Sequence, residues 1–405
     1  MHAAAGGGAQ SSNVHQLLLQ LAPEYLEQFG PSMPGRHKQV LKKIRSCRTP
    51  ALGGEMFKCP ECPGFEYRYH SCNDRHCPQC GQTDADAWLQ RQGERLLFAV
   101  PYFFVTFTIP QELRMFFRSH QRIALNLFFA VTSKALQDLA GNPDRLGAQL
   151  GMLGVLHTWA RSLIFHPHIH YLIPGGGLSP DGRQWIASDK KFLLHHTALG
   201  AHARTLFKEQ LQKEHPALFV QVPKSVWKNP WNVGCKAVGS GENALRYLSR
   251  YVFKTATGNR KVTLLPEHKV LWTYRDSKTR KFTSIKLEPL DWMSRFLQHI
   301  LPPHFARVRT FGWMHPAAKV RANRVRALLR EKPVLTQAEK DTWKPPAAAQ
   351  VQTASALPAA AQPSTQESQP VPLRCGPQCP RCGKIMRRVG SWGPGQMMIY
   401  PKRPP

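Results

Sequence analysis

Hydrophobic and polar positions follow two different periods along the chain, and each change of period marks a predicted element. Apolar residues recur every three to four positions in the predicted helices, which are residues 14–46, 85–100, 111–141, 189–215 and 242–256. They alternate, with many β-branched and aromatic residues, in the predicted strands, which lie at 101–110, twice within 151–178, and at 261–265, 269–276 and 281–287. This mixture predicts an α+β fold.

Residues 346–373 differ in composition from the rest of the chain. The stretch "PAAAQVQTASALPAAAQPSTQESQPVPL" contains no aromatic residue and few large apolar ones, so it cannot build a core. We therefore predict a disordered linker here. A short cysteine-containing segment, "CGPQCPRCGK", follows it.

The net charge narrows the class of partner. The 405 residues include 55 Lys and Arg against 25 Asp and Glu, which gives a formal charge of +30. This excess favours a polyanionic partner, and nucleic acid fits better than a membrane surface. The N-terminus lacks the basic start and apolar core of a secretory signal, and Pro101 interrupts the most apolar run, residues 96–110. We therefore expect a cytoplasmic protein with no membrane partner.

Two pairs of cysteines predict a structural zinc site. In a reducing compartment, clustered cysteines indicate metal more often than disulfides. "CPEC" at 59–62 and "CPQC" at 77–80 are separated by 14 residues, a spacing that allows four thiolates to surround one zinc ion. We therefore predict zinc on Cys59, Cys62, Cys77 and Cys80. With sulfur in all four positions no water can bind, so this zinc would shape the domain rather than catalyse.

Other residues leave further zinc ligands open. A second site, or a replacement ligand for the first, could come from Cys47, His70, Cys72 and His76. The C-terminal segment offers only three ligands, Cys375, Cys379 and Cys382. We predict that it is a degenerate knuckle or one that borrows a ligand.

The stretch "HPHIHYLIPGGG", residues 166–177, places three histidines at alternate positions of a predicted strand. Side chains two positions apart share one face of a strand, so His166, His168 and His170 are predicted to point the same way. Two imidazoles at this spacing can chelate one divalent cation if a third ligand comes from elsewhere. Chance pairs are common among 18 histidines, so this pattern needs support from a second motif.

The stretch "LRYLSRYVFK" supplies the second motif. Tyr247 and Tyr251 are four residues apart on a predicted helix, so their hydroxyl groups project from one face. Arg246, Arg250 and Lys254 add cations beside them, which is unusual for a core stripe and suits a bound phosphate.

Together the two motifs predict phosphoryl transfer. A phenol with a pKa of about 10 attacks phosphorus poorly unless the phosphate charge is neutralised, and a cation held by histidines would neutralise it. The predicted product is a 5′-phosphotyrosine with a free 3′-hydroxyl. The covalent link conserves the phosphodiester energy, so rejoining needs no ATP, and the sequence contains no G-x-x-x-x-G-K-[ST] loop.

The order of six motifs resembles that of the rolling-circle transposases of the insertion sequence 91 family, within the HUH endonuclease superfamily. The likeness covers about residues 36–325, and the HUH motif resembles His168-Ile169-His170. The motifs are "FKCPEC…YHSCNDRHCPQCG", "VPYFFVTFTIP", "GVLHTW…HPHIHYLIPGGGLS", "AVGSGENALRYLSRYVFK", "YRDSKT" and "RVRTFGWMHPAAK".

The resemblance implies a nuclease domain with a central antiparallel sheet, in a ferredoxin-like or RRM-like arrangement, flanked by helices and preceded by a zinc-binding domain. The histidines would lie on a central strand, with magnesium or manganese as the metal, and the tyrosines on a facing helix. Candidates for the third metal ligand are, in order of preference, His157, His166, and Glu242 or Asn243.

The resemblance also implies an activity: nicking of single-stranded or hairpin transposon ends and strand transfer by a rolling-circle mechanism. Tyr251 is the favoured first nucleophile because Arg250 and Lys254 flank it, and Arg246 joins these two as a predicted DNA contact. The enzyme would work in the bacterial nucleoid, and a host helicase is an expected partner because the sequence offers no unwinding machinery.

Two other functions stay open at this point. A plasmid or phage replication initiator or relaxase would share the histidines and tyrosines, although the cysteine segment ahead of the nuclease counts against it. A zinc-dependent DNA-binding regulator would use the same residues without catalysis.

The predicted order of domains is N-terminal helices (1–46), a zinc-binding domain (47–90), the nuclease or transposase domain (91–315), a basic helical extension (316–345), the linker (346–373) and the C-terminal cysteine knuckle (374–405). Single strands are usually held by cations and stacking aromatic rings. Trp227, Trp231, Trp272 and Tyr274 lie among lysines and arginines and are candidate stacking residues as patches, although core packing is the more common role of any single tryptophan.

Overall fold

The chain folds into two compact units. The computed structural model describes residues 10–80, 96–97, 100–239, 257, 261–276, 279, 281–330 and 376–396. The large unit takes in residues 1–45 and 72–334, and the small unit takes in residues 46–71 and 335–405. The chain therefore leaves the small unit after residue 71 and returns to it at residue 335.

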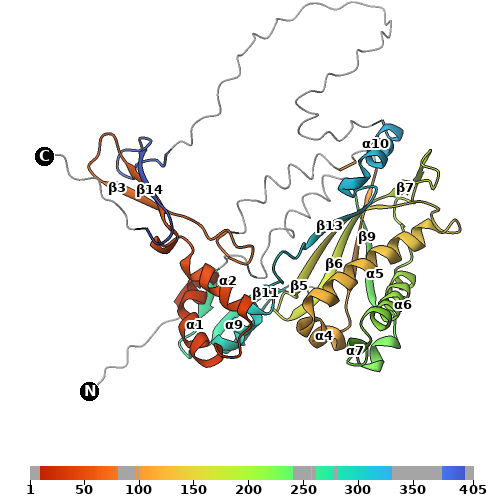
Figure 1. The fold of residues 1–405 in the computed structure, drawn as a ribbon, viewed down its shortest axis with the longest axis horizontal. Helices are drawn as coiled ribbons and strands as arrows, with labels where there is room; N and C mark the ends of the chain where they lie inside the picture. Colours follow the sequence, from red (N-terminus) through yellow and green to blue (C-terminus); the bar gives the residue numbers. More distant parts are fainter. Residues whose placement is uncertain are drawn as a thin grey trace, which may run out of the picture. The chain divides into compact units, whose positions relative to one another are not determined.

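A five-stranded antiparallel sheet forms the centre of the large unit (Figure 1). Its strands, in spatial order, are β13 (Val308–Gly312), β5 (Gly151–Trp159), β6 (Phe165–Pro174), β4 (Tyr102–Thr108) and β9 (Asn232–Gly239). The histidine strand β6 is thus the middle strand. The predicted α+β class and its central antiparallel sheet are confirmed.

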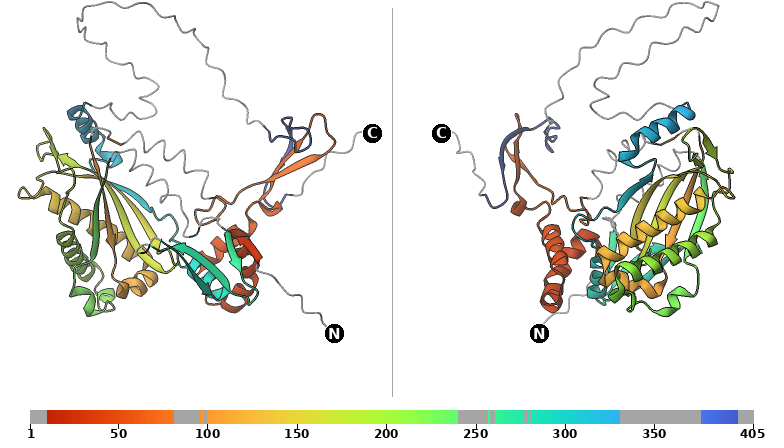
Figure 2. Two further views of the ribbon diagram at one scale, coloured as in Figure 1. Left: turned by 180° about the vertical axis from the view of Figure 1, so that it is seen from behind. Right: turned by 45° about the vertical axis from the view of Figure 1, so that its right-hand side comes forward.

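The side chains of this sheet divide between two faces because successive residues of a strand point in opposite directions. Phe103 and Val105 of β4 and Ile169 of β6 enter the main hydrophobic core. Phe104 follows Phe103 on β4 and lies opposite Leu172 of β6, and both enter a separate core on the opposite face of the sheet. The helices that bring side chains to the main core, shown against the sheet in Figure 2, are α4 (Arg114–Ser119), α5 (Gln121–Gly141) and α6 (His196–Glu214).

Tyr171 fixes β6 against α5. Its side chain is fully buried, and its hydroxyl oxygen lies 2.8 Å from Thr132 Oγ1 and 3.4 Å from the Phe129 carbonyl oxygen. Gly154 lies opposite Tyr171 on β5, and a Cβ there would come within 2.8 Å of the tyrosine ring. With Tyr171 held toward α5, the residues on either side of it point away from that helix.

The other part of the large unit contains a four-stranded antiparallel sheet and helices. The sheet order is β1 (Gln10–Asn13), β10 (Lys261–Leu264), β11 (Val270–Arg275) and β12 (Phe282–Leu287). A capping box of Asn13 and Gln16 begins α1 (Val14–Phe29), whose Tyr25 hydroxyl bonds to Ser294 in α9 (Pro289–Leu297) at 3.0 Å. Shorter or peripheral elements are α2 (Gly35–Ser46), η2 (Gln111–Leu113), β7 (Gly176–Leu178), β8 (Trp185–Ala187), α7 (Pro216–Phe219), η3 (Lys224–Trp227), η4 (Pro316–Ala318) and α10 (Lys319–Leu328).

The small unit is built around a three-stranded antiparallel sheet made from two distant parts of the chain. Its order is β14 (Arg387–Trp392), β2 (Gly54–Lys58) and β3 (Phe65–Tyr69), preceded by the short η1 (Pro50–Leu52). The ring of Trp392 packs edge to face against Tyr67 and Tyr69, at centroid distances of 6.3 and 6.1 Å. The C-terminal strand is therefore a packed member of this sheet.

Most predicted elements are present, with differences at their ends. The predicted helix at 14–46 is two helices, and the one at 111–141 is divided into η2, α4 and α5. Helix α6 begins at residue 196 rather than 189 because the Asp189 carboxylate accepts hydrogen bonds from the amides of Lys191 and Phe192, at 2.7 and 3.1 Å, and so forms a turn. The predicted helix at 242–256, and most of that at 85–100, lie outside the described residues.

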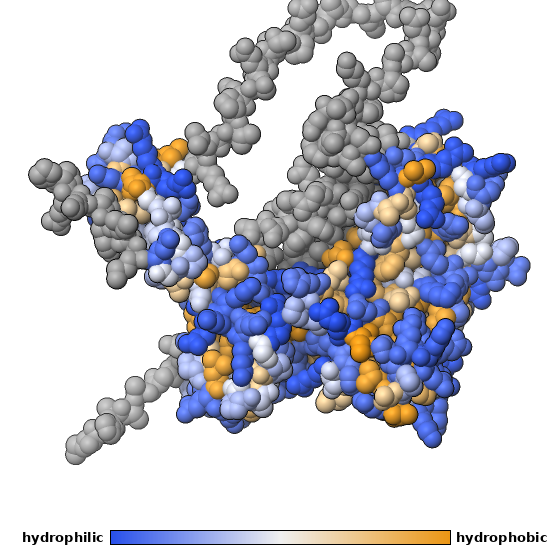
Figure 3. Space-filling model, in the orientation of Figure 1, coloured by the Kyte–Doolittle hydropathy of each residue, from blue (hydrophilic) through white to orange (hydrophobic). Residues whose placement is uncertain are grey.

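Across the described segments, no helix is both long enough and apolar enough to span a membrane. The face drawn in Figure 3 is largely hydrophilic, with only scattered hydrophobic spots. Scattered apolar residues of this kind are normal on protein surfaces.

Replacing Tyr171 by Phe tests the attachment of β6 to α5. The variant loses the bond to Thr132, which keeps its own bond to the Phe128 carbonyl oxygen, so we expect a loss of about 1 kcal/mol in the free energy of unfolding. Urea unfolding measures it. Tyr25→Phe, which removes a less buried hydroxyl bond, should cost less; equal stability of Tyr171→Phe and the unmodified chain would contradict the attachment.

Candidate metal centres

Three histidines gather on the sheet face opposite α5 and α6. His157 of β5 lies directly across from His168 of β6, and His170 follows on the same face. One ring nitrogen from each of the three lies within 4.8 Å of those of the other two. The structure therefore brings together the two residues of the histidine motif and the preferred third candidate, His157.

Hydrogen bonds to the outer ring nitrogens orient two of these histidines. Nδ1 of His168 lies 2.8 Å from the His166 carbonyl oxygen, to which it can only donate. Nδ1 of His170 lies 2.8 Å from the Thr106 hydroxyl. A proton on Nδ1 places the lone pair on Nε2, as in metal sites whose ligands are held by a second layer of hydrogen bonds.

The electrostatics of the cluster favour neutral imidazole. Burial lowers the pKa of His168 to about 4, although its bond to the His166 carbonyl opposes this. Burial, with the adjacent His168, also lowers the pKa of His170 well below its ordinary value. Metal ligands must be deprotonated, so at neutral pH both rings are in the form that can bind a cation.

His166 has a different partner from the other histidines of its strand. Its Nδ1 lies 2.9 Å from the Arg114 guanidinium, so it is placed as an acceptor for that side chain. It does not belong to the group of three ring nitrogens described above. The predicted tyrosine motif and its neighbours, Glu242, Asn243, Arg246, Tyr247, Arg250, Tyr251 and Lys254, lie outside the described residues.

The cysteines gather in a way that differs from the predicted tetrahedron. In the small unit, Cys59 and Cys62 meet Cys379 and Cys382, and the four sulfur atoms lie within 4.8 Å of one another. The predicted partners Cys77 and Cys80 belong to the large unit. The 14-residue spacer had suggested a closing loop, but part of it forms β3, whose five residues carry the chain away from Cys62 by about 17 Å.

The cysteine-rich loop of the large unit forms a second group. Sulfur atoms of Cys72, Cys77 and Cys80 lie within 4.8 Å of one another, with Cys72 and Cys80 3.6 Å apart. The Cys77 amide donates to the Asp74 carbonyl oxygen at 3.0 Å, and the Cys80 amide to that of Cys77 at 3.2 Å. Three thiolates thus have the spacing that a tetrahedral zinc site requires. Cys375 lies outside the described residues.

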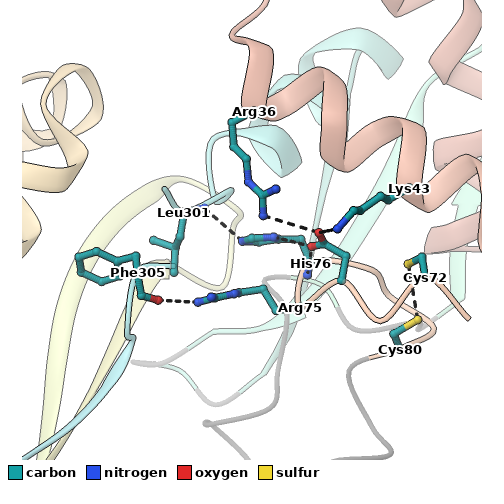
Figure 4. A network of polar contacts seen from close by, with 9 residues as sticks. Arg36, Lys43, Cys72, Arg75, His76, Cys80, Leu301 and Phe305 are labelled. Atoms are coloured by element: carbon teal, nitrogen blue, oxygen red, sulfur yellow. Dashed lines mark hydrogen bonds and ion pairs between the residues drawn. The ribbon is translucent and has the colours of Figure 1, made fainter. Parts of the chain in front are cut away.

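A buried carboxylate supports this loop (Figure 4). Asp74 accepts a hydrogen bond from His76 Nδ1 at 2.9 Å and lies 3.6 Å from both Arg36 and Lys43 of α2. Burial opposes ionisation of Asp74, but the hydrogen bonds from His76 and the nearby charge of Arg36 hold its pKa well below the usual range. The carboxylate is therefore charged at neutral pH and connects the loop to α2.

His76 is used within this network rather than as a zinc ligand. Its Nδ1 bonds to Asp74, and its Nε2 accepts the amide hydrogen of Leu301 at 3.1 Å (Figure 4). Both ring nitrogens therefore have protein partners, and His76 is absent from the cysteine groups among the described residues. The sequence had suggested His76 as a further zinc ligand. Asp74, two positions earlier, was the sequence signal that His76 instead takes part in a hydrogen-bond network.

The predicted aromatic stacking residues are mainly core residues. Trp231 and Trp272 are 2% and 1% exposed. Trp231 packs in the main core, and Trp272 packs against Trp292 and donates to the Arg161 carbonyl oxygen at 3.0 Å. Trp227 stacks on Phe219. Core packing, the more common role expected of a single tryptophan, is therefore the role of Trp231 and Trp272, and their rings are not open to DNA.

Comparisons with known proteins match this chain to transposases and to a zinc-binding domain. Residues 17–109 match the family described as "Transposase zinc-binding domain", and residues 151–323 match the family described as "Putative transposase". The chain is 32% identical over 303 residues to "Putative transposase y4qJ" of Sinorhizobium fredii, covering 70% of this chain and 75% of that protein. It is 29% identical over 296 residues to "Transposase for insertion sequence element IS801" of Pseudomonas savastanoi pv. phaseolicola, covering 68% and 70%. No solved structure matches the chain.

The low pKa of His168 gives a prediction for the metal-free protein. The ring should stay neutral from pH 7 down to about pH 4, whereas an unfolded histidine takes up a proton near pH 6.5. Since the unfolded chain binds the proton first, the stability that this histidine contributes is complete above pH 6.5 and falls as the pH drops toward 4. Histidine ring NMR should report the titration; a midpoint above pH 6 would contradict the assigned burial.

A second prediction concerns the carboxylate under the cysteine loop. Asp74→Asn leaves the cations of α2 without their anion, so we expect a loss of roughly 1–3 kcal/mol in the free energy of unfolding. Asp138→Asn is the matched control, because Asp138 forms surface ion pairs with Lys134 and His202, which should contribute less than about 1 kcal/mol. Equal losses of unfolding free energy for the two variants, measured by urea unfolding, would show that the buried Asp74 network stabilises the chain no more than a surface ion pair does.

Proposed function

We propose that this chain, which belongs to the insertion sequence 91 family of transposases, nicks single-stranded transposon ends through a tyrosine nucleophile and transfers the strand by a rolling-circle mechanism. Membership of the family makes it a transposase that acts on DNA. The single observation that supports the finer mechanism is the group of His157, His168 and His170 on the sheet face opposite α5 and α6.

The three histidines would hold a divalent cation. Their neutral rings and mutual distances fit such an ion, and imidazole donors favour manganese over magnesium. Bound there, the cation would supply charge stabilisation for the phosphate that reacts. Thr106 would position His170, since its hydroxyl bonds to the outer nitrogen of that ring.

The nucleophile would be Tyr251 or Tyr247, with Tyr251 acting first. The phenol oxygen forms a bond to phosphorus while the bond from phosphorus to the 3′ oxygen breaks, and the tyrosine proton is replaced by one on the new 3′-hydroxyl. The product is a 5′-phosphotyrosine, and a later attack by a 3′-hydroxyl restores the phosphodiester without ATP. Arg246, Arg250 and Lys254 would neutralise the phosphate charge.

The substrate would be single-stranded or hairpin DNA at the ends of the element. The net charge of +30 suits such a polyanion. Unwinding would come from a host helicase in the bacterial cytoplasm, at the nucleoid. A replication initiator is the less favoured reading because both relatives described above are transposases.

Zinc supports the structure of the N-terminal domain, as the family match over residues 17–109 and the cysteine groups indicate. We propose that Cys72, Cys77 and Cys80 are ligands of one such ion. A zinc ion held by thiolates in a closed tetrahedron has no position for water, so this zinc would take no part in the reaction.

The test is nicking of single-stranded oligonucleotides that cover the element's ends, in the presence of Mn²⁺. The full chain should cut them and stay covalently attached to the new 5′ end, seen as a shifted band that survives denaturation. Tyr247→Phe combined with Tyr251→Phe should abolish the adduct. His170→Ala should lower the rate at least about 100-fold, since electrostatic stabilisation is lost, and Thr106→Val should weaken Mn²⁺ binding by roughly 10–100-fold.

Matched variants separate these effects from general damage. Tyr67→Phe changes a tyrosine of β3 in the small unit, whose ring packs on Trp392, and His202→Ala changes a histidine of α6 that pairs with Asp138. Both should nick at the unmodified rate. Continued adduct formation by the double tyrosine variant would refute the proposed nucleophile.

A further inference from the structure

We infer that Cys59, Cys62, Cys379 and Cys382 hold one structural zinc ion, and that the C-terminal segment, residues 376–396, is therefore the second half of the zinc-binding domain. The family match to that domain ends at residue 109, so it includes only the first two of these cysteines. The inference concerns the C-terminal segment and does not depend on the proposed nuclease chemistry.

The sulfur positions fit a tetrahedral ion. Zinc–sulfur bonds of about 2.3 Å in a tetrahedron place neighbouring sulfurs about 3.8 Å apart. The four sulfurs here lie within 4.8 Å of one another, and those of Cys59 and Cys382 are 3.5 Å apart. All four cysteines are free of disulfides, so the thiols can supply four thiolates.

Each half of the site has the local backbone that a C-x-x-C ligand pair needs. The Cys62 amide donates to Cys59 Sγ at 3.3 Å, which orients the first pair. In the second pair, the Gly383 amide donates to the Cys379 carbonyl oxygen at 2.8 Å. The Cys379 amide donates to the Lys384 carbonyl oxygen at 2.7 Å. Gly383 has φ +74°, a left-handed conformation that glycine adopts without strain. The tight turn in "CPRCGK" thus presents both thiols to one point.

Contacts outside the thiols join the same two parts of the chain. β14 pairs with β2 along its length, with Arg387 opposite Lys58 and Trp392 opposite Gly54. Arg388 forms an ion pair with Glu55 at 2.9 Å. Lys384 pairs with Glu61, which lies between the first two ligands. The strand and the ion pairs fix the register that brings Cys379 and Cys382 to the first pair.

The small hydrophobic core of this unit explains why a metal is needed. Its buried cluster consists of Phe57 and Met386 together with Cys59 and Cys379, and Cys62 packs against it. Domains with so little apolar surface to bury are usually stabilised by disulfides or metals. Since binding of structural zinc is coupled to folding, the ion would supply much of the stability of this unit.

Zinc content of the purified full chain tests the assignment. Cys379→Ser combined with Cys382→Ser should lose one zinc equivalent relative to the unmodified chain, measured by elemental mass spectrometry. Cys235→Ser is the matched control, because Cys235 lies in β9 outside both cysteine groups, and it should keep the full zinc content. Unchanged zinc in the double variant would overturn the inference.

A cleavage experiment keeps the inference testable if the double variant folds poorly. A site-specific protease sequence placed within residues 346–373 would allow the chain to be cut between the two halves of the site. With zinc present, the C-terminal fragment should elute with the rest of the chain in gel filtration, and removal of zinc by EDTA should release it. Separation of the fragment while zinc is present, or its retention after complete removal of zinc, would overturn the inference. Neither outcome depends on nicking activity, so failure here is distinguishable from failure of the proposed function.

Discussion

The two-residue repeat of β6 is the constraint on which both the main core and the histidine cluster depend. Ile169 and Tyr171 enter the core, so His168 and His170 must point to the opposite face. A shift of register by one residue would turn the imidazoles toward α5 and the core side chains toward the opposite face. Tyr171 prevents such a shift because its hydroxyl reaches Thr132 of α5. A core contact on one face thus sets the geometry of the polar cluster on the other.

The chain carries two kinds of potential metal-ligand group, which differ in donor chemistry. Among the described residues, the histidine group offers three imidazole nitrogens, a set that would leave coordination positions for a phosphate oxygen. Four thiolates close a tetrahedron and leave no such position. The first arrangement suits a reacting centre and the second suits a structural one. The histidines lie in the large unit, whereas Cys59, Cys62, Cys379 and Cys382 lie in the small unit, so the loss of one of these four cysteines and the loss of a histidine should have separable effects.

Local patterns predicted those parts of the molecule that depend on neighbouring residues. The two-residue spacing of His168 and His170 predicted that they share one face of the strand. His157 could be predicted as their partner because it lies on the preceding strand and successive antiparallel strands pair. The cysteine grouping could not be predicted this way. Spacing suggested that Cys59 and Cys77 share an ion, but β3 occupies the intervening residues, and the partner Cys379 is distant in sequence. Thr106 was missed because its contact with His170 requires the register of β4 against β6.

The split between Cys59 and Cys382 has a consequence for synthesis. The two residues are 323 positions apart. A ribosome that adds roughly 5–20 residues per second takes on the order of 15–60 s to travel between them. Throughout that interval β2 lacks β14, so one edge of its backbone stays open to pairing with other chains. A chain that terminates before residue 382 keeps that edge open permanently, which makes abortive translation products of this protein candidates for aggregation and proteolysis.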